Sequence, residues 1–124
     1  MMSLKNILLL NGASSGATGV LLLAFSRFFA NLFQVSSTMA FTGVGIFLIA
    51  FAAFVIWVSM GDTNRKRVQV IIALDVVWVV VSIIVGVLFY DEISFLGSIL
   101  IEVVALWVAA MVFLQTKGLK QVTL

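Results

Sequence analysis

The sequence contains no cysteine, no histidine and no proline. Without cysteine no disulfide can form, and without thiolate or imidazole groups the chain lacks the preferred ligands of zinc, haem and iron–sulfur sites. The same absence excludes serine–histidine and cysteine–histidine hydrolase schemes, which need an imidazole base. We therefore expect no metal site, no cofactor and no enzymatic activity.

Charge is also scarce in this chain. Only 10% of the 124 residues are charged, whereas 64% are hydrophobic; a soluble domain carries about 25% charged residues. A chain this short leaves much of its surface exposed on folding, so it cannot hide that much apolar surface from water. The expected solvent is the lipid bilayer. The net charge of +2 lies mostly in one loop and one tail, which indicates membrane topology rather than nucleic-acid binding.

Four stretches are long and apolar enough to cross the hydrocarbon core, which takes about 20 helical residues. They are residues 4–25, 38–60, 68–90 and 95–116. The first is predicted to be a span rather than a signal peptide, because apolar sequence continues past Ser15 to Phe25, where a cleavage site would fall. No linker interrupts the chain. We expect residues 1–124 to form a single all-α integral membrane domain, a four-helix transmembrane bundle.

A short amphipathic segment follows the first span. Apolar side chains recur there at the spacing of one helix face, with polar side chains opposite. The apolar members are Phe25, Phe28, Phe29, Leu32 and Phe33. This pattern predicts a short interfacial helix in the headgroup layer. A gate or lipid-sensing element is the alternative interpretation.

Basic residues are divided unequally between the two sides of the predicted bundle. Four spans put both termini and the loop between the second and third spans on one side. That side holds Lys5, Arg65, Lys66, Arg67, Lys117 and Lys120. The other side holds Arg27, Asp91 and Glu92. Because cytoplasmic loops are enriched in Lys and Arg, we expect a multi-pass membrane protein with both termini in the cytoplasm.

Small residues recur at four-residue spacing in the first and fourth spans. Helices in lipid associate through close backbone contact, which small residues allow. The candidate packing positions are Gly12, Gly16, Gly19, Ala105 and Ala109. Packing within the bundle is the favoured interpretation, because four helices joined by short loops must pack on each other. A homodimer, or a contact with another membrane protein, is the alternative.

Two ionisable residues, Asp75 and Glu102, fall inside predicted spans, where such residues are costly and mark candidate functional sites. Counted from the basic side at 1.5 Å per residue, Asp75 lies about 12 Å deep and Asn11 about 9 Å deep, so these two can meet. Glu102, Ser82 and Thr18 lie about 20–22 Å deep and could form a second polar layer.

Trp78 lies one helical turn past Asp75, and an aromatic ring beside a carboxylate can hold a cation. A low-dielectric site disfavours the charged form of a carboxyl, so both acids can serve as protonated hydrogen-bond donors between helices. This favours a structural or accessory membrane protein. The alternative is a small proton- or cation-coupled transporter or ion pathway. Its candidate residues are Asp75, Glu102, Asn11, Ser82, Trp78 and Thr18.

Residues 74–79 (LDVVWV) and 114–120 (LQTKGLK) resemble features of small four-span bacterial membrane proteins without an assigned function. The resemblance covers most of the chain and implies a bacterial inner-membrane protein, but no activity. In size and span number the chain is also similar to the small multidrug resistance transporters. Those proteins carry an essential glutamate in the first span, where this chain has Asn11 and no carboxylate.

Overall fold

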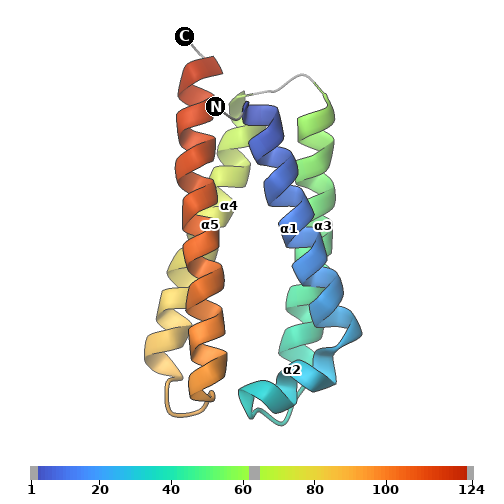
Figure 1. The fold of residues 1–124 in the computed structure, drawn as a ribbon, viewed down its shortest axis with the longest axis vertical. Coiled ribbons are helices and arrows are strands. Elements are labelled where there is room, and N and C mark those ends of the chain that lie inside the picture. Colours follow the sequence, from blue (N-terminus) through green and yellow to red (C-terminus); the bar gives the residue numbers. More distant parts are fainter. Residues whose placement is uncertain (1–2, 62–64, 123–124) are drawn as a thin grey trace.

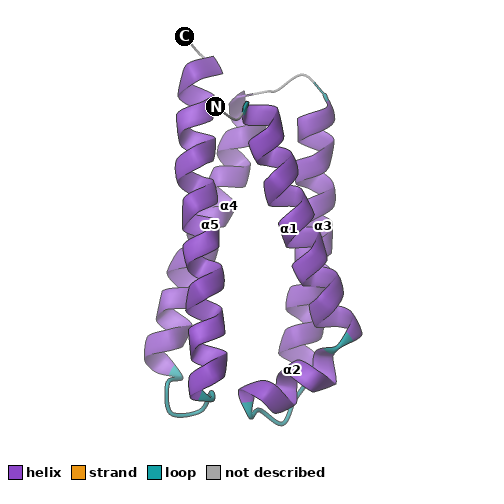
Figure 2. Cartoon of the chain, in the orientation of Figure 1, coloured by secondary structure: helices purple, strands orange, loops and turns teal. Residues whose placement is uncertain are grey.

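The structure is a computed structural model that describes residues 3–61 and 65–122, which are mostly helical (Figure 2). Its helices are α1 (Leu4–Ala24), α2 (Ser26–Phe33), α3 (Met39–Met60), α4 (Arg65–Leu88) and α5 (Phe95–Val122). The helices α1, α3, α4 and α5 are long and apolar enough to cross a membrane. The predicted all-α bundle with a short helix after the first span is confirmed. Residues 62–64 of the predicted second loop lie outside the described residues.

Two helices extend beyond their apolar stretches at the end of the bundle that carries both termini. α4 begins at Arg65 rather than at residue 68, and α5 continues to Val122 rather than ending at residue 116. Hydrophobicity reports only the length inside the hydrocarbon, whereas a helix can continue through the headgroup layer while its Lys and Arg side chains reach water. We call this end the basic end and the opposite end the far end.

The long helices form two antiparallel pairs, α1 with α3 and α4 with α5 (Figure 1). The pairs converge at the basic end and diverge toward the far end (Figure 1). There, α2 reaches from the first pair to the second, where the Ser94 backbone N–H donates to the Phe33 carbonyl. The space between the pairs therefore has a contact at each end.

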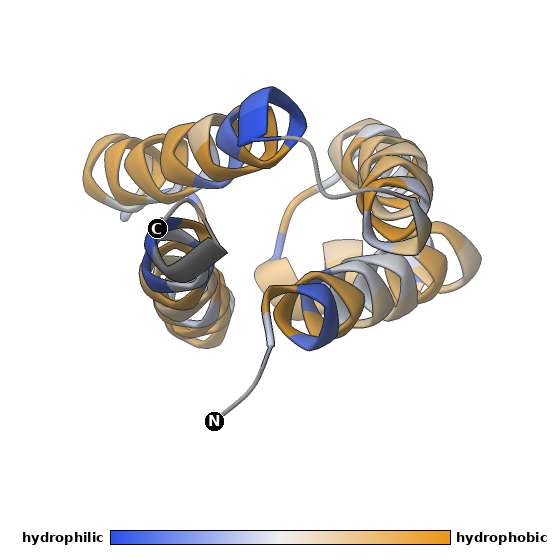
Figure 3. Cartoon of the chain, turned by 90° about the horizontal axis from the view of Figure 1, so that it is seen from above, coloured by the Kyte–Doolittle hydropathy of each residue, from blue (hydrophilic) through white to orange (hydrophobic). Residues whose placement is uncertain are grey.

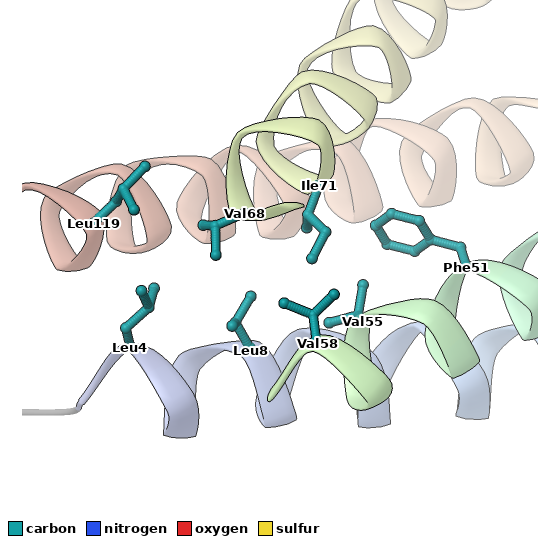
Figure 4. Packing of buried hydrophobic residues seen from close by; sticks show 8 residues of the cluster. All are labelled: Leu4, Leu8, Phe51, Val55, Val58, Val68, Ile71 and Leu119. Atoms are coloured by element: carbon teal, nitrogen blue, oxygen red, sulfur yellow. The ribbon is translucent and has the colours of Figure 1, made fainter. Parts of the chain in front are cut away.

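Apolar contact between the two pairs is concentrated at the basic end. Side chains from α1 and α3 face side chains from α4 and α5 there (Figure 4). The cluster consists of Leu4, Leu8, Phe51, Val55, Val58, Val68, Ile71 and Leu119. Because all four long helices contribute to it, this cluster closes the basic end of the bundle.

Within the first pair, α1 and α3 approach closely where glycine faces glycine. A Cβ on Gly19 would lie 2.8 Å from the carbonyl oxygen of Gly45, and a Cβ on Gly45 would lie 2.9 Å from the carbonyl oxygen of Gly19. Gly12 and Gly16 also face side chains of α3. The small-residue face of α1 is therefore occupied by α3 of the same chain.

Most apolar side chains face outward. In the most apolar window of each long helix, at most 28% of the residues are buried. Seen from the basic end, apolar residues dominate the long helices, and hydrophilic ones gather where α1 and α4 begin and α5 ends (Figure 3). Of the two predicted packing positions on α5, Ala105 is buried and Ala109 is half-buried. This outer surface requires lipid, as in a multi-pass membrane protein.

The apolar face of α2 is divided between the bundle and the surroundings. Phe33 packs edge-on against Phe41 of α3, with ring centroids 5.0 Å apart, and Phe29 stacks on the same ring at 6.4 Å. Phe25 and Phe28 are exposed. Phe29 and Phe33 thus anchor α2 to the bundle, while the other two rings remain available to the membrane interface.

We call the close approach of Gly19 and Gly45 the glycine seam. It predicts that Gly45→Ala destabilises the protein by roughly 1–3 kcal/mol relative to Gly43→Ala, because the added Cβ meets rigid backbone of α1. Gly43 is a matched control on the same helix, since a Cβ there has nothing within 4 Å. Both variants gain the same helix propensity. Unfolding in detergent, followed by circular dichroism, measures the difference. Equal unfolding midpoints would contradict the seam.

Candidate functional site

Asp75 lies in a buried hydrogen-bonded group made by three helices. Asn11 of α1 donates from Nδ2 to Asp75 Oδ2 at 3.0 Å and to Gln115 Oε1 at 2.8 Å. Gln115 of α5 donates from Nε2 to the same Asp75 oxygen at 2.9 Å. All three side chains are buried, with at most 4% of their surface exposed. We call Asn11, Asp75 and Gln115 the Asp75 network.

Both carboxamides of the Asp75 network use their oxygen and their nitrogen in hydrogen bonds. Asn11 Oδ1 accepts a hydrogen bond from Ser15 Oγ at 3.2 Å, while its Nδ2 serves both partners in the network. Gln115 both accepts and donates within the network. Asp75 differs, because only Oδ2 accepts hydrogen bonds from the described residues and Oδ1 accepts none. One oxygen of the carboxyl is therefore held in place and the other is available.

Asp75 also lines a cavity of about 40 Å³ inside the bundle. All four long helices contribute to its wall. The lining residues are Ser14, Ser15, Thr18, Phe47, Leu48, Phe51, Leu74, Asp75, Trp78, Val104, Trp107 and Val108. On α1, α4 and α5 these positions lie at or beyond the Asp75 network in the direction of the far end. A cavity of this size holds about three water molecules or one small cation.

Two tryptophans give the cavity its aromatic wall. Trp107 of α5 donates from Nε1 to Ser14 Oγ of α1 at 3.1 Å, which fixes its ring. Trp78 Nε1 is buried and finds no acceptor among the described residues. Indole faces attract cations and a carboxylate supplies full negative charge, so the combination suits a small cation.

The remaining candidate residues do not hydrogen-bond to Asp75. Thr18 lines the cavity, but its hydroxyl donates to the Ser14 carbonyl of its own helix at 2.8 Å. Ser82 is buried outside the cavity wall. Glu102 is half-buried against Gly86 of α4, where an added Cβ would lie 2.6 Å from its Oε2. No hydrogen bond joins Thr18, Ser82 and Glu102 in the part of the chain that the structure describes.

The structure thus brings four of the six candidate residues together. Asn11 contacts Asp75 directly, and Trp78 and Thr18 line the cavity beside it. Sequence analysis did not include Gln115, which lies at the end of the predicted fourth span, among the candidate residues. Gln115 could have been found by assuming that the last helix continues past Lys117, because this would place Gln115 deeper in the membrane. Gln115 lies seven residues before the end of α5, about 10 Å, just as Asn11 lies seven residues after the start of α1.

Comparison with known proteins adds no functional assignment. No protein family, no curated protein and no solved structure matches the chain. Among the described residues, no group of three His, Cys, Asp or Glu side chains could hold a metal ion. Inference about function therefore starts from the Asp75 network and its cavity.

We expect Asn11→Leu to destabilise the bundle by about 1–3 kcal/mol, because it removes three hydrogen bonds, each of which contributes on average about 0.6 kcal/mol in a membrane, and leaves buried polar atoms unpaired. Asn6→Leu is the matched control, since Asn6 is an exposed asparagine on the same helix. Unfolding in detergent compares the two variants. If both unfold with the same midpoint, the Asp75 network does not hold the helices together.

Proposed function

We propose that this chain is a non-enzymatic membrane protein that binds a proton or a small cation at Asp75 and carries it across the bilayer. The observation that supports this is the state of the Asp75 carboxyl. One oxygen accepts hydrogen bonds from the amides of Asn11 and Gln115, which lie on two other helices. The second oxygen accepts no hydrogen bond from the described residues. The Asp75 side chain also lines an aromatic-lined cavity.

The Asp75 network accommodates both protonation states of the carboxyl. Oδ2 can accept from Asn11 and Gln115 whether the group is neutral or charged. Oδ1 can carry the proton in the neutral state and contact a cation in the charged state. Exchange of a proton for a cation at this oxygen therefore leaves the hydrogen bonds between helices in place. Such exchange is the elementary step of proton-coupled transport.

The size of the cavity restricts the class of substrate. Sites for drug-sized ligands occupy about 300–1,000 Å³. The cavity beside Asp75 has about 40 Å³, so in this conformation it admits water, a hydrated proton or a cation of a few atoms. The proposed cargo is therefore a proton or a small cation.

Movement of the two helix pairs relative to each other is the proposed route of access. The apolar cluster closes the basic end. At the far end, Ser94 at the start of α5 donates from Oγ to the Leu32 carbonyl of α2 at 2.8 Å and from its backbone N–H to the Phe33 carbonyl at 2.9 Å. The Asp75 network joins α1 to α4 and α5 between these two closures. Asp75 therefore lies on the boundary that has to open.

A structural or accessory membrane protein is the second candidate function. The observation that favours it is that Asn11, Asp75 and Gln115 hydrogen-bond to one another across three helices, as a polar connection between helices requires. In that case Asp75 would stay protonated, and the protein would act through a partner in the membrane.

The proposed location is the inner membrane of a bacterium, with both termini in the cytoplasm. The support for this orientation is the distribution of charge, since α4 begins with three basic residues and α5 ends beside Lys120 at the same end of the bundle. The positive-inside rule assigns such an end to the cytoplasm. The bacterial origin rests on the resemblance of residues 74–79 and 114–120.

Proteoliposomes test the transport proposal. With a pH-sensitive dye inside and an imposed gradient of sodium, potassium or methylammonium, we expect wild-type protein to move protons against at least one of these ions. Asp75→Asn should abolish this flux, because the amide still accepts two hydrogen bonds but has no carboxyl proton to release. Glu102→Gln is the matched control and should retain the flux, since Glu102 does not line the cavity. Wild-type vesicles without flux would favour the accessory function.

Reporter fusions test the orientation. Green fluorescent protein fused after Leu124 should fluoresce, and alkaline phosphatase fused there should be inactive, because the basic end is placed in the cytoplasm. A truncation after Glu92, in the turn between α4 and α5, is the control and should give active alkaline phosphatase. The reverse pattern would overturn the orientation.

A further inference from the structure

A second hollow lies between α4 and α5 at the basic end, separate from the cavity beside Asp75. It has a volume of about 300 Å³. Its lining residues are Arg65, Gln69, Ile72, Ala73, Thr116, Leu119 and Lys120, and we call it the basic groove. Arg65, Gln69, Ala73 and Lys120 are exposed, so the basic groove opens on the outside of the bundle.

The lining of the basic groove changes from charged to apolar with depth. Arg65 begins α4 and Lys120 lies near the end of α5, so both cations are at the mouth. Gln69 and Thr116 each lie four residues further into the membrane, about 6 Å deeper. Ile72 lies about 10 Å deeper than Arg65. Apart from the buried Leu119, which lies beside Lys120, the order is therefore charge, then neutral hydrogen-bonding groups, then hydrocarbon.

A phospholipid presents the complementary order along its length, from phosphate through glycerol esters to acyl chain. No acidic side chain lines the basic groove to oppose an anion. Arginine pairs with a phosphate through two parallel hydrogen bonds, which a lysine alone cannot do. Basic pockets between transmembrane helices are suited to anionic headgroups, because the anion is held where the bilayer already places it.

We propose that the basic groove binds one anionic phospholipid. Arg65 and Lys120 contact the phosphate, Gln69 and Thr116 hydrogen-bond to the ester region, and one acyl chain lies along Ile72 and Ala73. A soluble anion such as inorganic phosphate fits only the mouth and gains nothing from the apolar depth. The apolar depth therefore favours the lipid over a free ion.

Native mass spectrometry of the purified full-length protein in detergent tests this site, with phosphatidylglycerol, phosphatidylcholine and inorganic phosphate as probes. We expect phosphatidylglycerol to bind more tightly than phosphatidylcholine. Arg65→Gln and Lys120→Gln should each weaken phosphatidylglycerol binding about fivefold. Lys117→Gln is the charge-matched control, since this exposed lysine lies on α5 outside the groove, and it should bind like the wild type.

A second variant separates the basic groove from general attraction to a positive surface. Ala73→Phe fills the deep part of the groove without changing the charge, and it should also weaken phosphatidylglycerol binding. Three results would overturn the proposal: equal binding of both lipids by the wild type, an unchanged preference in the Arg65→Gln and Ala73→Phe variants, or inorganic phosphate binding as tightly as phosphatidylglycerol. None of these measurements depends on Asp75, so a negative result for the lipid site would not contradict the transport proposal, and the reverse also holds.

Discussion

Lipid removes the usual reason for helices to associate, because the hydrocarbon around them is as apolar as their own side chains. This chain meets that constraint in two ways. Within the first pair, α1 and α3 come close enough for the backbones at Gly19 and Gly45 to touch. Between the pairs, the buried connection is polar, since Asn11 reaches both Asp75 and Gln115. The cavity follows from this arrangement, because the pairs diverge beyond the Asp75 network while α2 holds their far ends.

The spans and the contact between Asn11 and Asp75 could be predicted because both depend on position along a helix. Apolar length fixes where a span lies, and a rise of 1.5 Å per residue fixes how deep a side chain is. The rotation of each helix about its axis is not fixed in this way. Glu102, Ser82 and Thr18 lie at similar depths, yet Glu102 turns toward Gly86 and the hydroxyl of Thr18 bonds to its own helix. Gln115 was missed because its place at the end of the predicted span does not show which side of the helix faces Asp75, and α5 in fact continues to Val122.

The outer and inner faces of the α4–α5 pair carry different kinds of side chain. At the basic end, exposed cations and neutral polar groups line a groove that opens on the outside of the bundle. Deeper inside, Asp75 and Gln115 turn toward α1 and away from lipid. The second helix pair thus has an outer surface lined by cations and neutral polar groups and an inner surface that carries a carboxyl.

A hydrogen-bonded connection between the helices does not require the carboxyl group of Asp75. An asparagine at this position would present the same kind of oxygen to Asn11 and Gln115 without an ionisable group, and ionisable groups are costly near the middle of a span. The α1–α3 seam shows that this chain can join helices without any ionisable group. What only a carboxyl adds is a proton that can leave and a charge that can attract a cation. A proton or a cation would bind at the Asp75 oxygen that accepts no hydrogen bond from the described residues. Asp75 lines a cavity whose wall also contains two indole rings.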